Sequence, residues 1–178
     1  MDYNTFNNGG RTPGENPRFG YVSGTIVDIV PTMQGNRRAN GCILFATVED
    51  GNGEIVNIII SPATYVVDFE TLSVGMNCTF WYLADAPMIL IYPPQYNAAV
   101  AARNRNGRMI DVSRYGRGMV NKERTLQLRL DGSVDIMTAN NQYFQGSPEN
   151  HDLVVIYETS TRSIPAQTTP RRIVVLCN

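Results

Sequence analysis

Apolar and polar residues alternate along much of this chain with the period of two that a half-buried β-strand requires. The strands predicted in the first half are residues 21–30, 42–48, 55–60, 77–83 and 95–102. Most of these runs are rich in β-branched and aromatic side chains, which favour strands. The last run, 95–102, contains several alanines, so a short helix is the alternative there. Helical periodicity is nearly absent elsewhere, and the chain is therefore predicted to be mostly β.

The segments between these runs carry turn and loop signals. Residues 49–54 read Glu-Asp-Gly-Asn-Gly-Glu, and their Gly and Asn accept the positive φ of a hairpin turn. Residues 31–41 are predicted to be a loop, and 61–75 a connection with room for one or two helical turns. Residues 84–94 contain three prolines, which argue against a strand despite their apolar content.

The second half repeats the order of the first. Gly24–Ile29 resembles Gly107–Val112, and Val56–Ile58 resembles Val134–Ile136. The strands predicted in this half are residues 108–112, 125–130, 133–138, 153–158 and 172–176, with a tight turn at Asp131-Gly132. Internal similarity of this kind predicts a duplicated structural unit.

Five short strands with a longer connection between the third and the fourth follow the order of an OB-fold, a small Greek-key barrel. We therefore predict two tandem OB-like five-stranded barrels related by internal duplication. The predicted divisions are a flexible tail at residues 1–19, a first unit at 20–102 and a second unit at 103–178. An SH3-like barrel or a small sandwich is the structural alternative.

Charge is unevenly distributed along the 178 residues, although the formal net charge is only −1. Residues 1–101 hold four arginines against nine acidic residues, and residues 102–178 hold eleven basic against seven acidic residues. A basic half indicates an anionic partner. Attraction between an acidic and a basic unit of the same chain is the alternative explanation.

Several function classes are disfavoured by what the sequence lacks. It has no Gly-x-Ser-x-Gly elbow, His-Glu-x-x-His helix or phosphate-binding Gly-x-x-x-x-Gly-Lys loop. His151, the only histidine, lies in a polar stretch after Pro148 and is interpreted as a solvated loop residue. Acidic residues near the 49–54 turn leave a glycan-active enzyme as a remote alternative. We expect a non-enzymatic protein.

Neither a metal, a disulfide framework nor a membrane is expected. Cys42, Cys78 and Cys177 share no short spacing, which disfavours a disulfide framework and a zinc site. No stretch approaches the ~20 apolar residues of a membrane span. The sequence begins without a basic-then-apolar signal pattern, so we expect a cytoplasmic location. We also expect no cofactor.

Arginine-rich loops of the second unit are the predicted binding site. Positive grooves with aromatic platforms hold single-stranded nucleic acid, because every linkage has a charge and every base has a flat face. The predicted phosphate-contacting residues are Arg114, Arg117, Lys122 and Arg162. Tyr115, interleaved between two arginines, is predicted to stack on a base. Single-stranded nucleic acid or another anionic polymer is the expected partner.

A second hypothesis rests on the loop at residues 84–94. Its centre is too apolar for an ordinary exposed loop, and large exposed apolar patches mark interfaces. The predicted interface residues are Met88, Ile89, Leu90, Ile91 and Tyr92. They would contact the other unit, a second copy of the chain or a different protein. The aromatic residues around Trp81, by contrast, are predicted to lie in the core.

Overall fold

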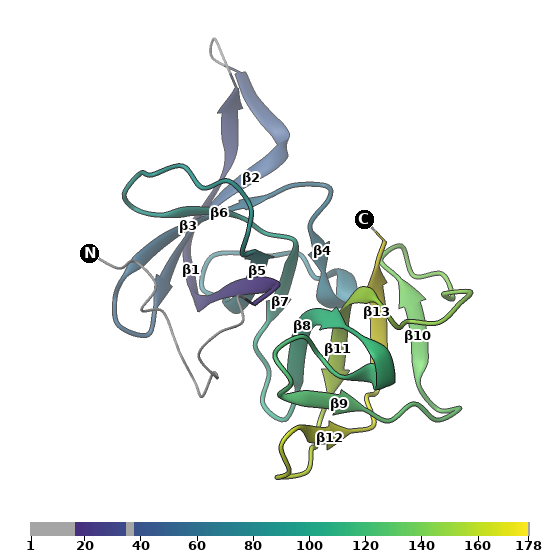
Figure 1. The fold of residues 1–178 in the computed structure, drawn as a ribbon. Coiled ribbons are helices and arrows are strands. Elements are labelled where there is room, and N and C mark those ends of the chain that lie inside the picture. The colour runs from purple at the N-terminus through teal and green to yellow at the C-terminus, as the bar shows by residue number, and fades with distance from the viewer. Residues whose placement is uncertain (1–16, 35–37, 178) are drawn as a thin grey trace. The chain divides into compact units, whose positions relative to one another are not determined.

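The computed structural model describes residues 17–34 and 38–177, with side chains described outside 33–40. The chain divides into two compact units (Figure 1). The N-terminal unit comprises residues 19–105, and the C-terminal unit comprises residues 106–177 together with Pro17 and Arg18. The fold is mostly β. In the described part of the chain, no helix combines the length and apolar character needed to cross a membrane.

The N-terminal unit is built on one sheet of seven strands in the order β4-β7-β5-β1-β2-β3-β6. Its elements are β1 (Phe19–Gln34), β2 (Arg38–Asp50), β3 (Ile55–Ile60), β4 (Tyr65–Val66), the 3-10 helix η1 (Val67–Phe69), β5 (Asn77–Leu83), β6 (Gln95–Asn97) and β7 (Val100–Arg103). The antiparallel β2–β3 hairpin has the predicted turn, where the Asp50 N–H donates to the Glu54 carbonyl at 3.0 Å.

Segment 95–103 contributes two strands to this sheet, β6 and β7. β6 pairs in parallel with β3, and β7 pairs antiparallel with β5. Between them, the Ala98 N–H donates to the Ile59 carbonyl at 3.0 Å and the Ala99 N–H to the Trp81 carbonyl at 2.8 Å. One continuous segment therefore pairs with β3 through β6 and with β5 through β7.

The prediction of a loop at residues 31–41 is wrong. β1 continues to Gln34 and β2 begins at Arg38, and the two strands pair from Gly24↔Asp50 to Gln34↔Arg38. Pro31 lies within the strand. Pairing of β1 with β5 ends at Thr25↔Asn77, so Pro31 lies on a stretch of β1 that β5 no longer covers. A proline, which lacks an N–H, is tolerated on such an edge.

Alternate side chains along the strands point inward and fill the interior of the N-terminal unit. Ile58 on β3 and Phe80 on β5 are fully buried, and they pack with Ile26, Ala46 and Val48 in one core cluster. Trp81 is also buried, as predicted.

The C-terminal unit contains a four-stranded sheet in the order β10-β13-β11-β8 and a separate β12–β9 pair. Its elements are β8 (Met109–Tyr115), the 3-10 turn η2 (Arg117–Met119), β9 (Leu126–Leu128), β10 (Asp135–Thr138), β11 (His151–Tyr157), β12 (Ala166–Thr168) and β13 (Arg172–Leu176). β11 pairs antiparallel with β8 and β13, and β10 pairs in parallel with β13.

The turn at Asp131-Gly132 does not join a β-hairpin, contrary to the prediction. β9 pairs in parallel with β12 through Leu126↔Ala166 and Leu128↔Thr168, and β10 pairs with β13. Leu126 and Leu128 are buried in the core cluster of this unit. The alternation of β9 was therefore recognisable from the sequence, but its partner strand was not.

Candidate functional site

The end of β8 and the start of β11 lie side by side in the C-terminal unit. The strands are antiparallel, with Arg114 opposite Asp152 and Tyr115 opposite His151. The loop that follows β8 carries η2 and returns to β8, because the Lys122 N–H donates to the Arg114 carbonyl at 2.8 Å. This pairing gathers charged side chains from segments far apart in the sequence.

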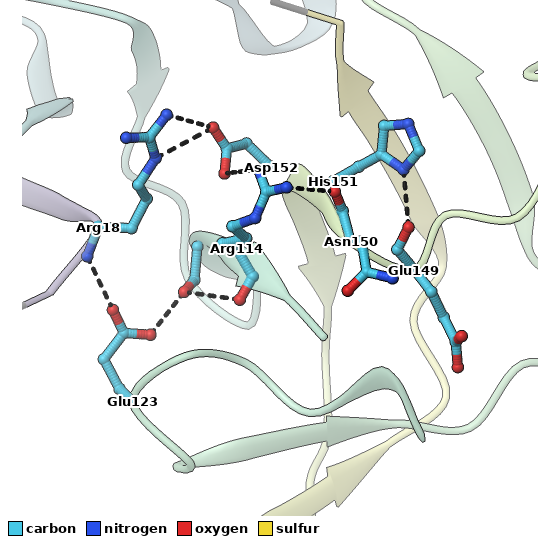
Figure 2. Close-up of polar contacts among 8 residues, drawn as sticks. Arg18, Arg114, Glu123, Glu149, Asn150, His151 and Asp152 are labelled. Carbon is cyan, nitrogen blue, oxygen red and sulfur yellow. Dashed lines mark hydrogen bonds and ion pairs between the residues drawn. The ribbon is translucent and has the colours of Figure 1, made fainter. Parts of the chain in front are cut away.

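The buried carboxylate of Asp152 lies between two arginines (Figure 2). Arg18 donates to its Oδ2 from Nε at 3.2 Å and from Nη2 at 3.0 Å. Arg114 reaches its Oδ1 from Nη1 at 3.5 Å and donates from Nη2 to the Asn150 carbonyl at 2.6 Å. A buried carboxylate requires such partners because burial removes its hydration.

Glu123 forms a second acidic contact beside this cluster. Its Oε2 accepts the Ser113 hydroxyl at 2.5 Å, and its Oε1 accepts the Arg18 N–H at 3.4 Å (Figure 2). Ser113 is itself buried on β8. Glu123 thus ties the loop after β8 to the strand and to the segment before β1.

The turn at residues 116–119 binds a carboxylate of its own chain. Gly118 has φ 72° and ψ 18°, a left-handed conformation suited to glycine. Its N–H donates to Glu149 Oε1 at 2.9 Å, and its carbonyl accepts from Gln127 Nε2 at 3.1 Å. Both backbone polar groups of Gly118 are therefore hydrogen-bonded, one to the segment before β11 and the other to β9.

Asn121 organises the rest of the loop. Its buried side-chain Oδ1 accepts the N–H groups of Thr125 at 2.8 Å and Leu126 at 3.0 Å. Its Nδ2 donates to Thr125 Oγ1 at 2.9 Å and approaches Asp111 Oδ2 at 3.4 Å. One amide thus connects the loop to β8 and to the start of β9.

Asp111 accepts a hydrogen bond from the fully buried Tyr115, whose hydroxyl lies 2.6 Å from Asp111 Oδ2. Burial raises the pKa of Asp111 to about 6; the Tyr115 and Asn121 hydrogen bonds oppose the rise, and the charge of Glu123 adds to it. Burial also raises the pKa of Tyr115, and the Asp111 charge and hydrogen bond add to that rise.

We expect the C-terminal unit to gain stability as the pH falls. A carboxyl whose folded-state pKa is about 6, above its ordinary value of 3.8, binds its proton more tightly when folded. Between pH 7.5 and pH 5 this contributes about 1–1.5 kcal/mol to the free energy of unfolding. Amide hydrogen exchange of β11, measured in increasing urea at each pH, gives this change in the free energy of unfolding. Asp111→Asn should flatten this dependence, and Asp135→Asn, on the exposed surface of β10, should leave it in place.

The structure brings three of the predicted anion-binding residues into one region. Arg114 is the second-last residue of β8, Arg117 lies in η2, and the Lys122 N–H donates to the Arg114 carbonyl. All three side chains are exposed. Arg162 is also exposed but lies on another loop, where the neighbouring Thr161 N–H donates to the Gln167 carbonyl of β12 at 2.9 Å. β12 in turn pairs with β9, which begins a few residues after η2.

The predicted base-stacking role of Tyr115 is wrong. The residue has 0% exposure and packs in the core of the C-terminal unit, so its ring offers no face to a ligand. Alternation explains the error, because side chains along β8 point in turn to opposite faces of the sheet. Arg114 lies on the exposed face, and Tyr115 lies on the buried one.

The apolar loop predicted to form an interface is exposed in the N-terminal unit. Leu90 is 93% exposed and Tyr92 is 77% exposed, and Met88, Ile89 and Ile91 are also exposed. The loop precedes β6, and its last residue, Pro94, accepts the Asn57 N–H at 2.9 Å. The end of the loop is therefore anchored on β3.

Sequence reasoning missed Arg18, Glu149 and Asp152. Arg18 lies within the predicted tail, and Asp152 directly follows His151 in the polar stretch after Pro148. One available signal was that Asp152 directly precedes the apolar run Leu153–Ile156, because an acid entering a buried strand requires a partner. His151 is half-buried in β11 rather than solvated in a loop, and its Nδ1 lies 2.9 Å from the Glu149 carbonyl.

Among the described residues, no group of three or more histidine, cysteine or acidic side chains is placed to hold a metal ion. The site therefore consists of a cationic loop, a buried carboxylate with two arginines, and an internal carboxylate on the Gly118 turn. Comparison of the chain with protein-family models, with curated proteins and with solved structures finds no match.

Proposed function

We propose that this protein is a non-enzymatic binding module that holds an anionic polymer, preferably single-stranded nucleic acid, on the loop after β8. Arg117 and Lys122 contact phosphates, and Arg162 extends the contact from the neighbouring loop. Arg114 contributes positive charge at the edge, because much of its hydrogen-bonding capacity is used by Asp152 and Asn150.

The single observation that carries this proposal is that, within the part of the chain that the structure describes, exposed cations on these loops lack acidic partners, while the acids beside them are already hydrogen-bonded. In residues 17–34 and 38–177, Arg117, Lys122 and Arg162 are exposed and form no ion pair. The acids beside them are already engaged, since Glu123 and Glu149 accept internal hydrogen bonds. Exposed cations without partners favour an external anion, and arginine suits phosphate through its planar fork of donors.

We further propose that the N-terminal unit is an OB-like barrel. β1 pairs with β2 and β5, β2 with β3, and segment 95–103 with both β3 and β5, which is the strand order of that fold.

Internal duplication is supported by three pairings that recur in the C-terminal unit. β8 pairs with β11 as β1 pairs with β5, and β11 pairs with β13 as β5 pairs with β7. β10 pairs in parallel with β13 as β3 pairs in parallel with β6. The β9–β12 pairing marks the difference between the copies.

Titration of a fluorescent single-stranded oligonucleotide at two salt concentrations tests the binding proposal. Arg117→Ala with Lys122→Ala should weaken binding about 10-fold or more at low salt, because two phosphate contacts are lost. The slope of log K against log salt should fall by about 1.4, since each single-strand phosphate contact contributes about 0.7.

Arg171→Ala is the matched control. Arg171 belongs to the same unit and carries the same charge, but it pairs with Glu158 at 3.6 Å. This variant should leave the salt slope unchanged. If Arg171→Ala lowers the affinity as much as Arg117→Ala or Lys122→Ala does alone, binding depends on net charge and not on this loop. If the wild-type protein does not bind the oligonucleotide at low salt, the proposed function is wrong.

A second function, protein–protein association through the 88–92 loop, is favoured by a different observation. Leu90 is almost fully exposed and its apolar neighbours are exposed with it, so water contacts a run of five large apolar residues. Such a run costs free energy until it is covered. The partner we propose for it is a second copy of this chain.

Leu90→Asp should reduce the mass measured by light scattering to that of a single chain, because a charge in an apolar contact loses hydration. Ile164→Asp is the control: Ile164 is 95% exposed on a loop of the C-terminal unit and lies among polar residues. An unchanged mass in Leu90→Asp removes this loop from any self-association.

A further inference from the structure

The Gly118 turn already contains an anion, and it comes from the protein itself. Backbone N–H groups exposed by a turn can bind an anion. In this turn the Met119 N–H donates to the Gly116 carbonyl at 3.1 Å, so the Gly118 N–H is the donor that meets the acid. The Glu149 carboxylate lies at this position, 2.9 Å from the Gly118 N–H. A carboxylate and a phosphate present the same kind of negatively charged acceptor oxygen to an N–H group.

We propose that Glu149 occupies the place of a ligand phosphate and competes with it, so that the Gly118 turn is a phosphate subsite closed by an internal carboxylate. This inference rests on the proposed function, because it assigns a contact point and a regulatory element to the same loop. The ligand class is a phosphate group, either free or part of a polymer.

The surroundings of the turn favour an exchange of anions. Arg117 precedes Gly118 directly, and neither Arg117 nor Lys122 forms an ion pair within the described residues, with Glu149 or with any other acid. The Glu149 side chain therefore uses the Gly118 N–H and leaves both cations unpaired. A phosphate, with more charge and more acceptor oxygens, can accept from the N–H and from a cation together.

Glu149 is fixed from its backbone, which limits what its carboxylate can reach. The Asn150 carbonyl accepts from Arg114 at 2.6 Å (Figure 2). The Asn150 N–H donates to the Tyr115 carbonyl at 2.7 Å. The segment would stay anchored if the side chain of Glu149 turned away. Displacement by a ligand then requires rotation of one side chain and no rearrangement of the strands.

The test uses the full chain, with inorganic phosphate and a single-stranded oligonucleotide as separate probes. Phosphate binding is followed by the ¹H–¹⁵N signal of Gly118, and oligonucleotide binding by fluorescence anisotropy. Glu149→Gln keeps an acceptor oxygen but removes the charge, and should tighten phosphate binding about 3- to 10-fold. Glu158→Gln makes the same charge change at an exposed position of the same unit and should have a smaller effect.

Glu149→Asp separates displacement from net charge. It keeps the charge but withdraws the carboxylate by one methylene, and it should also tighten phosphate binding. An unchanged affinity in Glu149→Asp, or equal gains in Glu149→Gln and Glu158→Gln, overturns the inference. A Gly118 signal that phosphate leaves unmoved in the wild type and in Glu149→Gln also overturns it, even where the oligonucleotide binds. A Gly118 response without oligonucleotide binding contradicts the polymer function but supports this subsite.

Discussion

Gly24→Ala should prevent stable folding of the N-terminal unit or lower its free energy of unfolding by about 3 kcal/mol or more. Gly24 is buried in β1, which pairs on one side with β2 and on the other with β5. A Cβ at this position would lie 2.2 Å from the Glu49 carbonyl oxygen and 2.9 Å from Val48 Cγ1. The first of these atoms is backbone held in the sheet, so a rotamer change cannot relieve the collision.

Urea unfolding monitored by tryptophan fluorescence measures this effect, because Trp81 is the only tryptophan and is buried in β5 of the same unit. Gly51→Ala is the matched control. Gly51 lies in the turn of the β2–β3 hairpin, and nothing lies within 4 Å of an added Cβ there. Gly51→Ala should shift the midpoint little. Gly24→Ala with a wild-type midpoint would contradict the close approach of β1 and β2.

Tyr115→Ala should destabilise the C-terminal unit by about 3–5 kcal/mol, the usual cost of removing a large aromatic side chain from a core. The ring has 0% exposure and packs with Leu153 and Ile173 in the core cluster. Its hydroxyl also donates to the carboxylate of Asp111 at 2.6 Å, and the substitution leaves that acceptor without this donor.

Amide hydrogen exchange in β11 reports this loss, because Trp81 belongs to the other unit. Tyr143→Ala is the control: Tyr143 has the same side chain but is 69% exposed in the same unit. It should change stability by less than about 0.5 kcal/mol. Tyr115→Phe separates the two contributions, since it keeps the ring in the core and removes only the hydrogen bond. Equal protection of β11 in Tyr115→Ala and Tyr143→Ala would contradict the burial of Tyr115.

The anion-binding loop shows how far residue type alone can predict a site. Arg117 and Lys122 could be predicted as exposed cations, because charged side chains rarely enter a core and the loop after β8 is rich in glycine. Tyr115 could not be assigned to a face from its neighbours. Two arginines flank it at 114 and 117, but the strand ends between them, and only the position of β8 in the sheet places its ring inside.

By itself, the sequence determined the positions of most strands and the mostly β character, because alternation and turn residues act over a few neighbouring positions. The β2–β3 hairpin followed for the same reason. Only the tertiary structure decided that Arg18 pairs with Asp152, 134 positions away, and that β9 pairs with β12 instead of β10. Such contacts depend on which distant segments bury each other, and the free energy of that burial is not contained in any local pattern.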